Sequence, residues 1–268
     1  MNLWEHVERQ AAHAVEAGAL HHIETVAHLM EDGGVPFVVR QGTGLVKKET
    51  PGSRTAGDPF ATPEPELFVA DLSPTHYALL NKYNVLDRHL LVVTRVNVSQ
   101  DEPLDAGDFE SLARCMEGQQ VLGFYNGGAT GGASQPHKHL QVVRLPLSPF
   151  GCEIPVEALM AGNSGTVPGF PMRHAFARGN AGDPKWLLGR YHDMRRVLAL
   201  EDAPYNLLVA RDWMLLVPRV RAMFGTIPLN SLAFAGALFV RDEEELHTVE
   251  RIGPMAALRG VAFPKDPS

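Results

Sequence analysis

Two histidines and a glutamine alternate along one short segment of this chain. They are His137, His139 and Gln141, in the run Gly131-Gly132-Ala133-Ser134-Gln135-Pro136-His137-Lys138-His139-Leu140-Gln141-Val142-Val143. If the segment is extended, alternate side chains share a face, so the three polar groups lie in a row with neighbours roughly 6–7 Å apart. Leu140 and Val142 then face a core. A row of two imidazoles and an amide behind a glycine-rich turn indicates a site that handles an anionic, phosphate-like group.

Three interpretations of this row compete. A polar strand edge would suit a lone histidine better than two histidines and a glutamine at i, i+2 and i+4. A metal site needs a third protein ligand, and neither Cys152 nor Glu153 stands at a recognisable ligand spacing, so no protein-held metal is expected. The favoured interpretation is nucleophilic catalysis, in which a neutral imidazole nitrogen attacks phosphorus and forms a phosphoramidate. That ring must hold its other nitrogen as a donor, and its neighbours must neutralise the phosphoryl oxygens.

The residues around the row offer further anion-binding groups. The loop Tyr125-Asn126-Gly127-Gly128-Ala129-Thr130-Gly131-Gly132 is rich in glycine, which permits positive φ and lets backbone amides converge on an oxyanion. Ser134 and Gln135 follow and can hold a neighbouring phosphate. Asn81 and Asn84 are either turn formers or contacts for ribose and phosphate. Lys47 and Lys48 either reach a phosphate or form a solvated charged pair, and the spacing leaves both pairs of alternatives open.

Several strands and helices are needed to position these groups. Apolar runs predict strands at residues 36–40, 67–70, 77–80, 90–95, 205–210 and 213–219. Arg211-Asp212 predicts a tight hairpin between the last two. Helical patterns are expected at residues 3–30 (one or two helices, with Gly18 as a possible break), 104–124, 186–200, 230–240 and 242–251. A Gly- and Pro-rich passage at residues 151–182 indicates a soft boundary between two modules.

Composition limits the class of protein. The 268 residues suit one large domain or a domain with an appendage. A formal net charge of −7 disfavours nucleic acid as the main partner but not a small nucleotide. No apolar stretch is long enough to span a bilayer, so no membrane partner is expected. The two cysteines, Cys115 and Cys152, form no Cys-x-x-Cys pair, and this fits a reducing cytoplasm. The N-terminus shows no basic region followed by an apolar run, so no signal peptide is expected.

The central motif resembles that of a known family. The run His137-Lys138-His139-Leu140-Gln141 resembles the His-x-His-x-Gln variant of the histidine triad, which marks the nucleotidyltransferase branch of that superfamily. With Tyr125-Asn126-Gly127 and the run from Gly132, it looks like the ATP adenylyltransferases, also called diadenosine tetraphosphate phosphorylases. The similarity continues in blocks that span most of the chain: Asn81–Val85, Tyr205–Leu208, Trp213-Met214, Val217–Arg219 and Asn230–Gly236.

This resemblance implies a fold and a reaction. The fold is α+β, a histidine-triad-like antiparallel sheet flanked by helices, with a C-terminal α/β extension packed on the core. Residues 1–165 would form the catalytic region and residues 166–268 the adenylyltransferase extension, together one compact unit. Diadenosine tetraphosphate and phosphate would give ATP and ADP reversibly. His139 would attack the α-phosphorus and carry AMP, Gln141 would contact the α-phosphate, and His137 would help to position it.

The resemblance also assigns substrate-binding residues and a cofactor. Phosphates would be bound by Ser134, Gln135, Asn126 and the Gly132 loop. Asn81 and Asn84 would lie near the ribose or phosphates, and Lys48 would be the phosphate-binding lysine of an N-terminal loop. A divalent cation such as Mg²⁺ would be bound with the substrate phosphates rather than in a protein cage. The partners implied are dinucleoside polyphosphates, ATP, ADP and phosphate.

Alternatives remain within and outside this class. Another nucleotidyltransferase of the same branch would act like a hexose-1-phosphate uridylyltransferase or use sulfate as the acceptor. A hydrolase would release AMP with water. A nucleotide-binding sensor without turnover is a different class, and the intact His137, His139 and Gln141 argue against it, because a sensor needs no in-line nucleophile.

Overall fold

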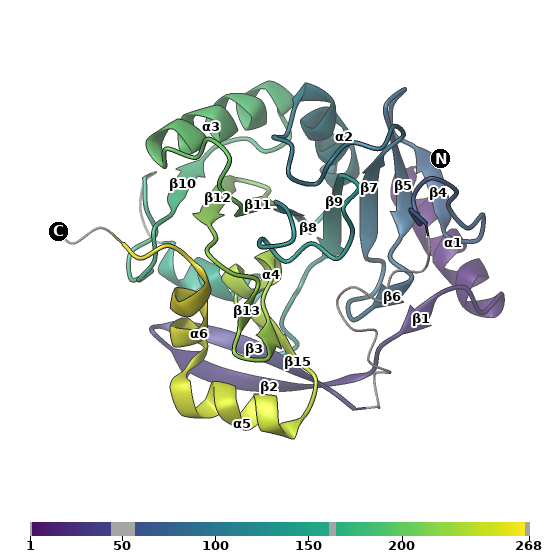
Figure 1. The fold of residues 1–268 in the computed structure, drawn as a ribbon. Coiled ribbons are helices and arrows are strands. Elements are labelled where there is room, and N and C mark those ends of the chain that lie inside the picture. The colour runs from purple at the N-terminus through teal and green to yellow at the C-terminus, as the bar shows by residue number, and fades with distance from the viewer. Residues whose placement is uncertain (1, 44–56, 161–164, 266–268) are drawn as a thin grey trace.

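An eight-stranded antiparallel sheet forms the centre of the computed structural model, which describes residues 2–43, 57–160 and 165–265 (Figure 1). The strand order is β10-β12-β11-β8-β9-β7-β5-β4. In chain order the strands are β4 (Phe68–Asp71), β5 (His76–Leu80), β7 (Leu90–Thr94), β8 (Val121–Asn126), β9 (His139–Arg144), β10 (Ala175–Arg178), β11 (Tyr205–Ala210) and β12 (Trp213–Pro218). Every neighbouring pair is antiparallel. The predicted α+β fold is confirmed.

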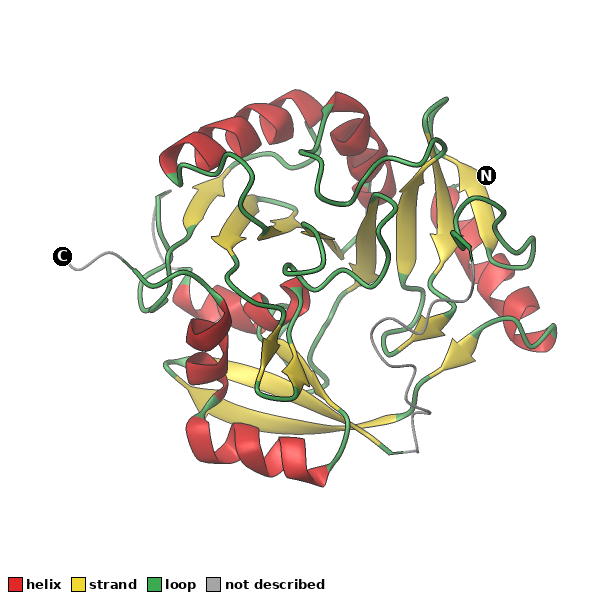
Figure 2. Ribbon diagram, viewed as in Figure 1, coloured by secondary structure: helices red, strands yellow, loops and turns green. Residues whose placement is uncertain are grey.

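Smaller sheets and helices cover the two faces (Figure 2). The order β15-β3-β2 joins β15 (Ala237–Val240), β3 (Val35–Gly42) and β2 (Thr25–Asp32), and two further pairs join β1 (His21–His22) to β6 (Tyr83–Asn84) and β13 (Met223–Phe224) to β14 (Ile227–Pro228). The helices are α1 (Leu3–Glu16), α2 (Ala106–Met116), α3 (Pro184–Val197), α4 (Ser231–Phe234), α5 (Glu243–Ile252) and α6 (Pro254–Val261), with a 3₁₀ turn η1 at Pro155–Leu159. None of the described helices is long and apolar enough to cross a membrane.

Strand β9 divides its side chains between two cores. Leu140 and Val142 enter a cluster that includes side chains of α1, α2 and α3. Val143 enters a second cluster on the other face, with side chains of β3, η1, β15, α5 and α6. Because successive side chains alternate across a strand, His139 and Gln141 share the face of Val143. The strand predicted for the central row is therefore present, and it places the polar row opposite the helix-covered face.

Two predicted helices are partly strand. The helix predicted over residues 3–30 ends at Glu16, and β1 and β2 follow. β2 pairs with β3 across the turn at Gly33 and Gly34, which both have positive φ, as hairpin turns with glycine allow. The second case is the helix predicted over 104–124, which ends at Met116, after which β8 begins. β8 is buried on both faces, so its continuous apolar run does not distinguish a strand from a helix.

The helix predicted over residues 230–240 is also shorter than expected. α4 ends at Phe234, and Gly236, with φ of 94°, turns the chain into β15. β15 pairs in parallel with β3, almost 200 positions earlier in the sequence, and such a long-range partner outweighs local propensity. The hairpin of β11 and β12 is found as predicted.

The predicted boundary at residues 165 and 166 stays a prediction, but the central sheet runs continuously across it. β11 pairs with β8, and Asn206 lies opposite Asn126. β10 and β12 extend the same sheet. The C-terminal strands thus share both cores with the N-terminal ones, as expected for an extension packed on the core.

A buried ionic cluster ties the start of β9 to α2. The Lys138 side chain leaves the strand on the face opposite His137 and His139, and its ammonium donates to Asp108 Oδ2 at 3.2 Å and to the Pro103 carbonyl at 2.8 Å. His76 Nε2 lies 3.0 Å from Asp108 Oδ1. Burial would raise the pKa of the Asp108 carboxyl, but His76 and Lys138 lower it overall. The ionised carboxylate therefore compensates the buried ammonium.

Replacing Asp108 with asparagine should destabilise the fold strongly. The substitution leaves the Lys138 ammonium buried without its counter-charge, which costs about 3–5 kcal/mol. Urea unfolding should show this loss for Asp108→Asn. Glu110→Gln, an exposed site on the same helix, should change the free energy of unfolding by less than about 0.5 kcal/mol. A loss below about 1 kcal/mol for Asp108→Asn would show that the pair does not anchor α2.

Candidate active site

His139 is held in the state that a nucleophile requires. Its Nδ1 lies 2.9 Å from the His137 carbonyl oxygen. Because a carbonyl only accepts, Nδ1 carries the proton and the lone pair is on Nε2. The side chain is 2% exposed, and burial lowers its pKa to about 4. The ring is therefore neutral near pH 7, with one defined tautomer.

Gln100 fixes the backbone at the same residue. Its Oε1 accepts from the His139 amide at 2.8 Å, and its Nε2 donates to the His139 carbonyl at 3.1 Å and to the Asn126 carbonyl at 2.8 Å. This side chain continues the hydrogen bonding where β8 and β9 separate, since their ladder is last recorded at the pair Phe124 and Gln141. No local sequence pattern points to Gln100, because its partners are 26 and 39 positions away.

Gln141 belongs to a relay that orients its amide. His89 Nε2 lies 2.8 Å from Gln141 Oε1, and His89 Nδ1 lies 3.1 Å from Asn81 Nδ2. If Asn81 donates to Nδ1, then Nε2 carries the proton and donates to the Gln141 oxygen. The Gln141 NH₂ group then faces away from His89 as a donor. Burial lowers the pKa of His89 to about 4, so this ring is neutral as well.

His89 was not among the predicted site residues. It stands next to the apolar strand β7, outside the alternating row, and only the pairing of β7 with β9 brings it to Gln141. Asn81 was predicted to lie near ribose or phosphates, and the structure places it at the far end of this relay. Its position at a turn between two strands was the available signal.

His137 lies beside His139, and a loop segment covers both rings. His137 is 1% exposed, with Nε2 2.8 Å from the Thr94 carbonyl oxygen and Nδ1 2.7 Å from Asp58 Oδ2. The Phe60 ring centroid lies 5.6 Å from that of His137 and 5.3 Å from that of His139. Neither Asp58 nor Phe60 was predicted from sequence, because both lie in a long polar loop before β4.

The glycine-rich loop is a turn stabilised by its own backbone. Gly131 and Ala133 donate to the Gly128 carbonyl, and Gly132 donates to the Ala129 carbonyl. Gly132 has φ of 93°, and a Cβ there would lie 2.8 Å from the Leu229 carbonyl oxygen, so only glycine fits without rearrangement. The Gly132 amide is thus engaged in the turn. The loop fixes the chain that leads to the exposed Ser134 and the half-buried Gln135, both predicted to bind phosphate.

Residues from the C-terminal part of the chain hold this loop in place by hydrogen bonds. Arg219, 1% exposed, donates to the Gly131 and Leu229 carbonyls at 3.3 and 2.9 Å and to the Asn206 side chain. Asn206 Nδ2 donates to Asn126 Oδ1 at 3.0 Å and to the Gly131 carbonyl at 2.7 Å. Ser231 donates to Asn126 Oδ1 through both its amide and its hydroxyl. The Asn126 oxygen is therefore a structural acceptor under the loop.

The remaining predicted residues are more scattered. Asn84 is 3% exposed on β6, and its Oδ1 has no hydrogen-bond partner in the described part of the chain. Such an acceptor keeps the capacity to take a hydrogen bond. Lys47 and Lys48 lie outside the described residues.

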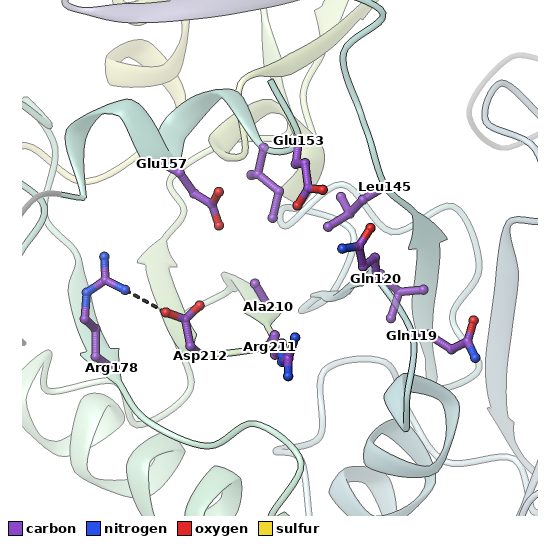
Figure 3. Close-up of a pocket in the computed structure, with 11 residues that line it drawn as sticks. Gln119, Gln120, Leu145, Glu153, Glu157, Arg178, Ala210, Arg211 and Asp212 are labelled. Carbon is purple, nitrogen blue, oxygen red and sulfur yellow. Dashed lines mark hydrogen bonds and ion pairs between the residues drawn. The ribbon is translucent and has the colours of Figure 1, made fainter. Parts of the chain in front are cut away.

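Glu153 lies away from the histidine row. It lines a cavity of about 340 Å³ with Leu145 and Val121, beyond the end of β9 and the start of β8, which is the opposite end of these strands from His139 (Figure 3). The Arg178 and Asp212 side chains in that cavity form an ion pair at 2.9 Å. Across the described ranges, no three His, Cys, Asp or Glu side chains come together as metal ligands.

Comparison with models of known protein families shows which family this chain belongs to. A family model described as the Ap4A phosphorylase N-terminal domain matches residues 1–162, Ap4A being diadenosine tetraphosphate. The chain belongs to the Ap4A phosphorylase family. A second model, described as the ATP adenylyltransferase C-terminal domain, matches residues 168–264. The resemblance found in the sequence is thereby confirmed.

Relatives of this family member come from Saccharomyces cerevisiae. Diadenosine 5′,5‴-P1,P4-tetraphosphate phosphorylase 2 is 29% identical over 238 residues, 72% of each chain. Protein APA1 is 26% identical over 274 residues, 86% of this chain and 84% of the relative. The crystal structure of yeast Ap4A phosphorylase Apa2 matches with a TM-score of 0.83 and 24% identity, covering 99% of both chains. This chain and Apa2 therefore share one fold along their whole length.

The buried neutral histidines of this family member should make its stability depend on pH. A histidine in the unfolded chain has a pKa near 6.5, whereas burial lowers the pKa of both His139 and His89 to about 4. Between these values only the unfolded state gains the protons, so the free energy of unfolding falls as pH falls from about 6.5 to about 4. At pH 5 the loss is about 2 kcal/mol per histidine.

Urea unfolding at pH 7 and pH 5 measures this dependence. His139→Asn should reduce the loss between the two pH values by about 2 kcal/mol, because the variant has no imidazole to protonate. The exposed His13→Asn on α1 should leave the loss as in the wild type. An unchanged loss in His139→Asn would contradict the neutral assignment of this ring.

Proposed function

We propose that this protein catalyses the reversible phosphorolysis of Ap4A by phosphate, giving ATP and ADP through a covalent histidine–AMP intermediate. Family membership supports the substrate and the transfer of an adenylyl group. One observation carries the mechanism: His139 is neutral, its Nδ1 proton is fixed by the His137 carbonyl, and Nε2 keeps its lone pair. This is the form of imidazole that attacks phosphorus.

In each of the two half-reactions one bond to the α-phosphorus forms and one breaks. In the first, the His139 Nε2 lone pair forms the N–P bond to the α-phosphorus, and the P–O bond to the leaving nucleotide breaks, so ATP departs with that electron pair. In the second, a phosphate oxygen forms a new P–O bond, the N–P bond breaks, and ADP is released. The ring is a cation while it carries AMP with Nδ1 protonated, and the His137 carbonyl stabilises that proton.

The neighbouring groups stabilise the charge on the transferred phosphoryl group. The Gln141 NH₂, oriented by His89, donates to an oxygen of the α-phosphate. Ser134 and Gln135 bind the adjoining phosphates from the end of the glycine loop. The Asn84 acceptor oxygen has no partner among the described residues, and it would accept from a ribose hydroxyl. Asn126 acts through the loop, since its oxygen is bonded to Asn206 and Ser231.

A divalent cation, Mg²⁺, is part of the same proposal. In the described part of the chain, the side chains around His139 are imidazoles, amides, a hydroxyl and the single carboxylate of Asp58, and this donor set fits a cation held by substrate phosphate oxygens and water. The cation would neutralise phosphate charge when bound. We also place the protein in the cytoplasm, supported by its two free cysteines, Cys115 and Cys152.

Isotopic labelling tests the nucleophile and the acceptor together. The wild-type protein incubated with α-³²P-labelled ADP, which transfers AMP to the enzyme by the reverse of the second half-reaction, should acquire an acid-labile, base-stable label, and His139→Ala should acquire none. His13→Ala, an exposed site, should label as the wild type does. With Ap4A as substrate, ATP and ADP should appear only when phosphate is supplied.

Other products would identify the competing functions. Release of AMP and ATP without phosphate would make the protein a hydrolase. Adenosine phosphosulfate formed with sulfate, or turnover of a nucleoside diphosphate hexose in place of Ap4A, would place it with another transferase of the branch. Undiminished labelling of His139→Ala would remove that residue as the nucleophile.

His89→Phe tests the relay to Gln141. Phenylalanine fills a similar volume but cannot donate to the Gln141 oxygen, so the amide is free to rotate. The loss of an oriented donor should lower kcat by about 10- to 100-fold, less than the 10²–10³-fold expected when such a donor is deleted. Steady-state kinetics of Ap4A phosphorolysis measures it, with circular dichroism as the check on folding. A kcat within twofold of the wild-type value would argue against the relay.

A further inference from the structure

His137 has hydrogen-bond acceptors at both ring nitrogens. Its Nε2 lies 2.8 Å from the Thr94 carbonyl oxygen and 2.9 Å from Thr94 Oγ1. The Thr94 hydroxyl donates to the Val96 carbonyl at 2.9 Å, so its proton is not directed at the imidazole. A carbonyl has no proton to give. Nε2 of His137 must therefore carry a hydrogen.

The second nitrogen faces an ionised carboxylate. Nδ1 lies 2.7 Å from Asp58 Oδ2. Asp58 also accepts from the Phe60 amide at 2.9 Å and from Asn97 Nδ2 at 2.9 Å, and such bonds stabilise the anion. Although burial would raise it, the pKa of the Asp58 carboxyl is lowered overall by Phe60, His137 and Asn97. A carboxylate only accepts, so Nδ1 also carries a hydrogen, and a ring protonated at both nitrogens is an imidazolium.

We propose that Asp58 is a positioning residue that holds His137 as an imidazolium, so that a fixed positive charge lies beside the neutral nucleophile His139. The charge assignment stands on the geometry of the unliganded protein alone. Its kinetic consequence rests on the proposed function, because the charge would act on the phosphoryl oxygens of the substrate.

The surroundings of His137 support the assignment of a charged ring to His137 and a neutral ring to His139. In its own segment, just before β9, the titratable group on the same face is His139, and the residue of β7 that contacts the ring is the uncharged Thr94. Lys138 points to the opposite face, where Asp108 compensates it. Beyond Asp58 lie Tyr77, whose hydroxyl donates to the Phe60 carbonyl at 2.7 Å, and Arg95, which stacks on Tyr77 and pairs with Asp71. Among these described neighbours, only the Asp58 carboxylate faces His137 as a counter-ion.

The two imidazoles then have complementary roles. A cation next to His139 disfavours a second charge there, which adds to burial in keeping the Nε2 lone pair free. The same cation offsets negative charge that gathers on the phosphoryl oxygens during transfer. Phe60, two residues after Asp58, packs on both rings and excludes water from the pair. Adjacent groups held in opposite protonation states are the usual basis of divided acid–base roles.

Nitrogen NMR of the unliganded protein tests the charge directly. In uniformly ¹⁵N-labelled protein at pH 7.5, both His137 ring nitrogens should resonate in the imidazolium range, and His139 should show a neutral ring with its proton on Nδ1. His137→Gln assigns the signals. In Asp58→Asn the His137 ring should become neutral, and Asp58→Glu should restore the imidazolium. A neutral His137 ring in the wild-type protein overturns the proposal, whether or not the enzyme turns over Ap4A.

Kinetics tests the consequence. Asp58→Asn should lower kcat by about 10- to 100-fold and change KM by less than about threefold, since the charge acts mainly on the transition state. Asp58→Glu should recover part of kcat. Asp71→Asn, an exposed carboxylate on the same side of the sheet, should leave kcat within twofold. An unchanged or higher kcat in Asp58→Asn, or a loss confined to KM, overturns the positioning role even if phosphorolysis itself is confirmed.

Discussion

The register of β9 is the constraint on which the rest of the site depends. Its pairing with β7 sets Val93 opposite His139 and Leu91 opposite Gln141, and its pairing with β8 fixes the other edge. A shift by one residue would turn the imidazoles into the helix-covered core and expose Leu140. The Gln100 amide and the buried Lys138 ammonium hold the first residues of the strand, where the ladder with β8 has ended. Catalytic geometry and core packing are thus specified by the same hydrogen bonds.

Burial then sets the chemistry of the row. Removing water from His139 and His89 makes their charged forms costly, so both rings stay neutral and their tautomers are decided by fixed acceptors and donors. His137 is equally buried but faces a carboxylate. The neighbouring histidines of this site therefore differ in charge through their partners alone. As a consequence, the free energy of unfolding falls at the pH values where these buried histidines would become protonated in the unfolded chain.

The sequence predicted the structure correctly where the residues that determine it are close together in the chain. The alternation of His137, His139 and Gln141 predicted a shared face, and the two apolar runs around Arg211-Asp212 predicted their hairpin. It was insufficient where the partner is distant: His89, Gln100 and Asp58 reach the row across 52, 39 and 79 positions.

The misassigned elements have the same cause. β8, β2 and β15 are strands because of the strands beside them, and a local apolar pattern does not report that pairing. The glycine loop was recognised correctly as a turn, but the engagement of the Gly132 amide within that turn depends on backbone geometry that no motif states.

The support of the glycine loop has a consequence for how the protein is made. The Gly131 carbonyl is held by Asn206 and Arg219, which follow it by 75 and 88 positions. At a synthesis rate of about 5–20 residues per second, Arg219 is added roughly 4 to 18 seconds after Gly131. For most of that interval the growing chain already contains the whole histidine row but lacks Arg219, one of the residues that fix the loop beside it. The histidines of this site are therefore synthesised before the last of the residues that hold the neighbouring loop in place.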